Sequence, residues 1–169
     1  MDNTWRTALW QQFGASIDML EQAVLACPDE LWGDRSQRPE YWYVTFHTLF
    51  FLDLYLTGSA EGFAPPAPFT LDEMDPRGIL PDRVYTRDEL LTYLEHGRKK
   101  CRETIANLTD EQAGRRCSFP WGEVSFVELL LDNMRHVQHH AAQLYLILRQ
   151  QTDSAPRWVS STKRKLGDE

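Results

Sequence analysis

Cysteine is scarce in this sequence. Only Cys27, Cys101 and Cys117 occur, far apart along the chain and without any Cys-x-x-Cys pair. An odd number of isolated cysteines argues against a disulfide framework and a zinc ribbon, and it is typical of proteins in a reducing cytoplasm. We therefore expect each cysteine to be a small buried apolar residue rather than a nucleophile.

Positive charge is also in short supply. The chain has 18 Lys and Arg residues against 25 Asp and Glu residues, which gives a formal net charge of −7 and a pI of about 5.2. A polyanion would meet net repulsion at such a surface, so these values argue against a nucleic-acid partner.

The sequence lacks long hydrophobic runs and visible targeting signals. Its first residues show no basic segment followed by an apolar one, the pattern of a secretory signal. The longest apolar run, from Tyr41 to Leu56, is interrupted by His47 and Asp53. That run is shorter than the roughly 20 residues that a membrane-spanning helix needs. These absences predict a soluble cytoplasmic protein without a membrane partner.

Several catalytic motifs are missing as well. There is no Gly-rich phosphate loop and no Gly-x-Ser-x-Gly nucleophile elbow. The segment around His136 is not a zincin motif, because Val137 stands where zincins carry the Glu that acts as general base. The paired Glu-x-x-His motifs of di-iron carboxylate bundles are absent too. Because these motifs are absent, the histidines are the remaining candidates for catalytic or metal-binding residues.

The chain does contain four long helical patterns. Apolar residues make up 42% of its 169 residues, enough for one domain with a substantial core. Apolar side chains recur at intervals of three and four residues in four segments. These are Thr4 to Ala26 with Thr4 as N-cap, Glu40 to Thr57, a third from Thr86 to about Leu108, and a fourth from Ser125 to about Arg149.

The segments between the helices carry their own signals. Residues 58–85 hold eight glycines and prolines, which rules out a helix and predicts a long connection between the second and third helices. Ser or Thr followed three residues later by Glu predicts capping boxes at Thr86 and Ser125. Residues 113–124 fit a short hairpin or an irregular loop. Together these features predict an all-α fold, a four-helix bundle forming a single domain over residues 1–169.

Two further expectations concern charged and polar surfaces. The basic cluster on the third helix is predicted to be a solvated face; it comprises Arg98, Lys99, Lys100 and Arg102. The tail, residues 151–169, is polar. We expect it to be frayed or docked through Trp158.

The histidines are the strongest chemical signal. Three of the five lie within Arg135 to His140. His136 and His140 are one helical turn apart on the same face, a spacing that lets two imidazoles share a metal ion. His47 lies on the most apolar helix, where an unpartnered polar side chain would be costly. The pattern therefore favours a metal site formed by His47, His136 and His140.

Other interpretations of these histidines stay open at this level. His47 alone fits a hydrogen-bonded core histidine, and the helical pair alone fits an exposed polar row. His139 is three residues after His136 and is a possible substitute ligand, although it points about 100° away from His140 around the helix. Asp132, one turn before His136, either accepts the far N–H of a ligating imidazole or belongs to a solvent-facing row.

These residues carry a family resemblance. The chain resembles the DinB-like (DinB/YfiT-like) family of metal-binding four-helix bundles. That family has one histidine on the second helix, then His-x-x-x-His followed three residues later by Gln-Leu. His47 in the aromatic second helix matches the first element, and His136 and His140 with Gln143-Leu144 match the second. Val137 and His139 depart from the family's usual residues.

The resemblance implies a divalent metal, usually zinc or nickel and sometimes manganese or iron, held by His47, His136 and His140. It also implies frequent homodimers. The family includes transferases and an isomerase that use low-molecular-weight thiols, which suggests a small-molecule substrate and a thiol-dependent S-transferase activity on small electrophiles. The alternatives are a non-enzymatic, stress-associated metal-binding dimer and a structural bundle whose histidines are incidental.

Overall fold

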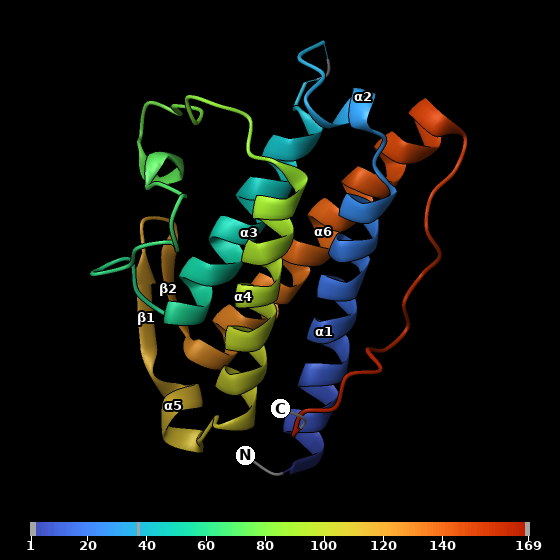
Figure 1. Cartoon of the computed structure of the whole chain (residues 1–169). Helices are drawn as coiled ribbons and strands as arrows, with labels where there is room; N and C mark the ends of the chain where they lie inside the picture. Colours follow the sequence, from blue (N-terminus) through green and yellow to red (C-terminus); the bar gives the residue numbers. More distant parts are fainter. Residues whose placement is uncertain (1–2, 37, 168–169) are drawn as a thin grey trace.

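The computed structural model describes residues 3–36 and 38–167. Four long helices pack side by side as a bundle, which confirms the predicted all-α architecture (Figure 1). They are α1 (Asn3–Ala26), α3 (Tyr41–Thr57), α4 (Arg87–Ala106) and α6 (Phe126–Thr152). Three short helical segments are α2 (Asp29–Trp32), η1 (Asp72–Met74) and α5 (Asp110–Gly114).

Each long helix packs against two of the others. α6 contacts both α1 and α3, and α4 contacts the same two helices from the other side. The apolar character of α3 follows from this arrangement, since 13 of its 17 residues are buried. The second helix is therefore deeply buried, as its sequence predicts, and α6 lies directly against it.

The predicted connection between the second and third helices is confirmed. α3 ends at Gly58, whose φ of 74° is the left-handed conformation that glycine adopts without strain. The chain then runs over the outside of the bundle, forming only η1 before it reaches Thr86 (Figure 1). Because this segment runs back along the outside of α3, it can bring distant residues to that helix.

The helix ends agree with the predictions to within a few residues. Thr86 and Glu89 form the predicted capping box of α4. At Ser125 only half of the predicted box is present: its hydroxyl accepts a hydrogen bond from the Glu128 backbone at the start of α6. α1 begins at Asn3, so Thr4 lies inside its first turn rather than at the N-cap. α6 continues to Thr152, beyond the predicted end at Arg149.

Of the two alternatives for residues 113–124, the structure has the hairpin. β1 (Arg116–Phe119) and β2 (Gly122–Ser125) pair antiparallel, with Phe119 opposite Gly122. Pro120 and Trp121 therefore form a two-residue turn at the tip. The hairpin lies beside α3 in Figure 1 and leads directly into α6.

The prediction that the basic cluster of the third helix is a solvated face is wrong for two of its members. Arg98 is only 2% exposed and forms ion pairs with Asp18 and Glu21 of α1. Lys100 is paired with the buried Asp53 of α3. The reason is tertiary: α4 packs between two helices that turn carboxylates towards it, and a local charge pattern does not reveal those partners.

Trp158 does not dock the tail, since it is 68% exposed. The tail instead lies along α1 (Figure 1), where the Trp10 indole donates to the Arg164 carbonyl at 2.7 Å. Thr162 packs on Gly14, where an added Cβ would lie 2.6 Å from the Thr162 methyl group. The close approach that glycine permits, together with backbone hydrogen bonds, therefore holds the tail.

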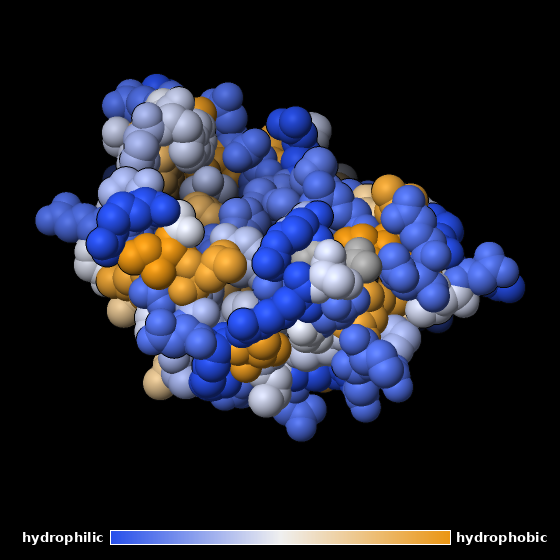
Figure 2. Space-filling model, turned by 90° about the horizontal axis from the view of Figure 1, so that it is seen from above, coloured by the Kyte–Doolittle hydropathy of each residue, from blue (hydrophilic) through white to orange (hydrophobic). Residues whose placement is uncertain are grey.

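No helix in the described part of the chain is long and apolar enough to cross a membrane. The end of the bundle that lies uppermost in Figure 1 is mostly hydrophilic, with separate hydrophobic patches between hydrophilic residues (Figure 2).

Candidate metal centre

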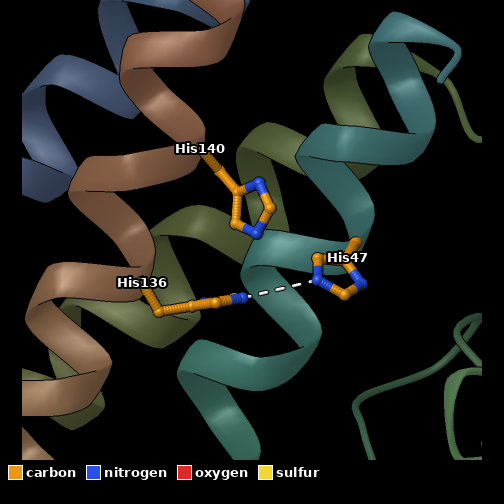
Figure 3. A group of neighbouring side chains, drawn as sticks. All are labelled: His47, His136 and His140. Atoms are coloured by element: carbon orange, nitrogen blue, oxygen red, sulfur yellow. Dashed lines mark hydrogen bonds between the residues drawn. The ribbon is translucent and has the colours of Figure 1, made fainter. Parts of the chain in front are cut away.

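Three histidines that are remote in sequence meet between α3 and α6. His47 comes from α3, and His136 and His140 come from successive turns of α6; their rings point towards one another (Figure 3). One ring nitrogen from each lies within 4.8 Å of the others. The Nε2 atoms of His47 and His136 are 3.4 Å apart. The structure thus brings all three predicted ligands into one cluster.

The packing of α6 on α3 sets this geometry. Val137 and Ala141 are fully buried and define the face of α6 that enters the core. His136 and His140 each precede one of them, so they fall at the border of the core, facing α3. One turn earlier, the buried Asn133 side chain donates to the Leu52 carbonyl of α3 at 3.0 Å. This interhelical hydrogen bond holds the two helices in register beside the cluster.

Two of the three rings have hydrogen-bond partners for their Nδ1 atoms. His47 Nδ1 lies 2.7 Å from Glu73 Oε2, and His140 Nδ1 lies 2.7 Å from Gln143 Oε1. A carboxylate accepts but does not donate, so His47 Nδ1 is the donor in its contact with Glu73, and Nε2 is the ring nitrogen that faces His136. Such partners orient histidine ligands in metalloproteins.

A comparison with known families agrees with this arrangement. The sequence matches the DinB superfamily over residues 12–144, a range that includes all three histidines. The chain belongs to the DinB superfamily. No match was found among curated proteins.

The spacing within this DinB-superfamily cluster suits a metal ion. Two nitrogen ligands at about 2.1 Å from a tetrahedral ion lie roughly 3.4 Å apart. The observed separation of the His47 and His136 Nε2 atoms, 3.4 Å, equals that value. Imidazole ligands suit zinc, nickel, copper and iron, so the donor set fits a divalent transition metal. Three protein ligands leave coordination positions for water or substrate.

The histidines of α6 are poised in the protonation state that metal binding needs. Burial and, to a smaller extent, the neighbouring imidazoles lower the pKa of His136 to about 3. Burial likewise lowers the pKa of His140 to about 4, against the opposing hydrogen bond with Gln143. Both rings are therefore neutral near pH 7, with lone pairs free for a cation. His136 Nδ1 is buried and has no hydrogen-bond partner among the described residues.

Sequence reasoning missed Glu73. Its side chain is 3% exposed and comes from η1, within the connection rich in proline and glycine. The one carboxylate considered from the sequence, Asp132, instead lies 3.6 Å from Arg135 and is 45% exposed. Asp132 is thus part of a solvent-facing row, the second of the two alternatives. No periodic pattern in the sequence marks Glu73.

His139 lies outside the cluster. It is exposed, and its ring centroid is 5.0 Å from that of His140. A surface hollow of about 640 Å³ runs past His139 and reaches His136, and it is also lined by Tyr55, Asp132 and Arg135. Of the three clustered histidines, His136 lines this hollow, so the cluster is open to solvent at His136.

Substituting Glu73→Gln tests the role of the buried carboxylate. We expect divalent metal affinity to fall by about 10- to 100-fold, because a neutral amide holds the Nδ1 proton of His47 less strongly than a carboxylate. Competition of the protein with a chromophoric chelator for zinc measures this change. Asp75→Asn is the matched control, since Asp75 lies on the same connection and forms an ion pair with Arg77 at the surface. Wild-type affinity in Glu73→Gln would show that the carboxylate does not support the centre.

Proposed function

We propose that this protein is a divalent-metal-dependent enzyme that joins a low-molecular-weight thiol to a small electrophile. The observation that carries the proposal is the cluster of three partly buried histidines, of which His136 lines a solvent-accessible hollow. His47, His136 and His140 would hold the ion, with zinc or nickel favoured and manganese or iron as alternatives. A divalent cation bound there would lower the pKa of a thiol that coordinates it.

The cysteines of the chain support an external thiol. All three are buried and free. Burial raises the pKa of the Cys27 thiol to about 12 and raises the pKa values of Cys101 and Cys117 as well. None of them is a thiolate at neutral pH, so the nucleophile would have to come from solution. Buried free thiols also fit the cytoplasm, which we propose as the compartment.

The residues of the chain would have separate tasks in this reaction. Glu73 would keep the proton on His47 Nδ1, while the aromatic rings of Tyr43 and Phe51, centred 6.2 and 4.9 Å from the His47 ring, would limit the access of water. The thiol loses its proton to solvent, its sulfur forms a bond to the electrophilic carbon, and the leaving group departs with the electron pair of the broken bond.

A conjugation assay tests the activity. Protein loaded with zinc or nickel would be incubated with cysteine, glutathione, bacillithiol or mycothiol and a haloalkyl electrophile, and thioether formation followed by mass spectrometry. We expect conjugation with at least one thiol, falling to the uncatalysed rate in His136→Ala because that variant removes a metal ligand. His139→Ala should keep the activity, since His139 lies outside the cluster.

The same assay distinguishes the proposed enzyme from a second candidate, a non-enzymatic metal-binding protein. The partial burial of the cluster, with the His47 side chain 29% exposed, favours that role. Stoichiometric metal without conjugation for any combination of thiol and electrophile would support it and contradict the enzyme proposal.

We also propose a homodimer. Apolar side chains of α1 and α6 form an exposed strip around a groove of about 260 Å³. Trp5 is 70% exposed and Leu131 is 45% exposed. The other apolar residues of the strip are Ala8, Leu9, Val127 and Met134. A contiguous apolar strip of this kind is typical of protein–protein contacts.

Leu131→Glu tests this interface. A charge in the strip should shift the protein from dimer to monomer, because the carboxylate would lose its hydration on association. Sedimentation velocity measures the change. Leu146→Glu is the control, since Leu146 is 53% exposed on the same helix but lies outside the strip. A monomeric wild-type protein, or equal effects of the two variants, would contradict the proposed interface.

A further inference from the structure

Four aromatic rings form a continuous row of ring contacts from the hairpin to the histidine cluster. We call this row, made of Phe51, Tyr55, Phe119 and Trp121, the aromatic shelf. The Trp121 and Phe119 rings are stacked, with centroids 5.7 Å apart and an interplanar angle of 3°. Tyr55 meets Phe119 and Trp121 edge-on at 5.2 and 6.2 Å. Phe51 continues the row, 5.5 Å from Tyr55.

The inner end of the shelf touches the candidate ligands. The Phe51 ring lies 4.9 Å from the ring of His47 and 5.7 Å from that of His136. Tyr55 lies 6.3 Å from the His136 ring. A molecule bound by a metal ion at the histidines would therefore have the shelf as its immediate neighbour.

The outer end of the shelf is exposed but fixed in place. Trp121 is 51% exposed, whereas Phe119 and Tyr55 beneath it are only 8% and 9% exposed. The two-residue turn places Trp121 at the hairpin tip, and stacking on Phe119 holds one face of its indole. A hydrogen bond between the side chains of Trp121 and Tyr55 partly offsets the rise in the Tyr55 pKa caused by burial. The indole is thus preorganised, with surface left for another ring.

This combination distinguishes Trp121 from the other exposed tryptophans. Trp5 belongs to the apolar strip between α1 and α6, and Trp158 lies on the tail, where it lines the hollow beside α6. Trp121 is linked to the histidine cluster through Tyr55, whose ring contacts both Trp121 and His136. Its position therefore points to a small molecule at the metal centre rather than to a protein partner.

We propose that the aromatic shelf seats a flat, uncharged, aromatic part of the substrate while the substrate's polar head reaches the metal held by His47, His136 and His140. The inference rests on the proposed function and adds a substrate class to it, namely thiols or electrophiles with an aromatic ring close to the reacting group. The four shelf side chains are uncharged at neutral pH, and aromatic rings favour other rings in edge-on and offset-stacked contacts.

Two hydroxamates test the proposal, one with a methyl group and the other with a phenyl ring in the same position. Acetohydroxamate and benzohydroxamate bind metals through the same two oxygens, so cobalt-substituted protein would be titrated with each and its visible absorption followed. We expect benzohydroxamate to bind roughly tenfold more tightly, because ring contacts and apolar burial add to a common metal-binding head. Quenching of tryptophan fluorescence by benzohydroxamate provides a second readout.

Substitutions of Trp121 and Trp158 test where the phenyl ring of benzohydroxamate binds. Trp121→Ala should remove most of the preference and leave acetohydroxamate affinity unchanged, whereas Trp121→Phe should keep most of it. Trp158→Ala is the matched control and should behave as the wild type. If Trp121→Ala keeps the preference for benzohydroxamate over acetohydroxamate, or if Trp158→Ala loses it instead, the aromatic shelf does not bind the ring. Either result would leave the proposed function unaffected. A spectrum that neither hydroxamate changes would overturn both, since no coordination position would be open.

Discussion

The candidate metal centre depends on the register between α3 and α6. Asn133 of α6 is fully buried, and its side chain donates to the Leu52 carbonyl of α3. A buried polar group of this kind is costly unless it meets its partner, so the contact favours one register over others. That register places His136 and His140 opposite His47. A slip of one residue would turn the pair towards the core or towards solvent and separate it from His47.

The bundle and the irregular segments contribute different parts of the site. The helices supply three histidines on rigid elements, which is how cofactor sites are built in helical bundles. The connection after α3 supplies Glu73, which forms a hydrogen bond with His47, and the hairpin before α6 supplies Trp121, whose ring contacts Tyr55. Both irregular segments flank the same helix, α3, so they complete the centre without interrupting the packing of the core.

The fold could be predicted from the sequence because its signals are local. Apolar residues at helical spacing, the Thr86 capping box and Gly58 each act within a few residues of where they appear. The histidine cluster could be predicted because His136 and His140 are one turn apart and His47 stands out on an apolar helix. Glu73 could not, because its role arises from where a long irregular connection returns to the bundle. Arg98 was misjudged for a similar reason, since its carboxylate partners Asp18 and Glu21 lie on another helix.

The central claim is that His47, His136 and His140 jointly hold one divalent metal ion and leave room for a further ligand. X-ray absorption spectroscopy at the metal edge of the purified protein, combined with elemental analysis, tests it most directly. The account predicts one metal per chain, three imidazole nitrogens at about 2.0–2.1 Å and at least one additional light-atom ligand. A protein without stoichiometric metal, or a metal with sulfur ligands or fewer than three imidazoles, would contradict it.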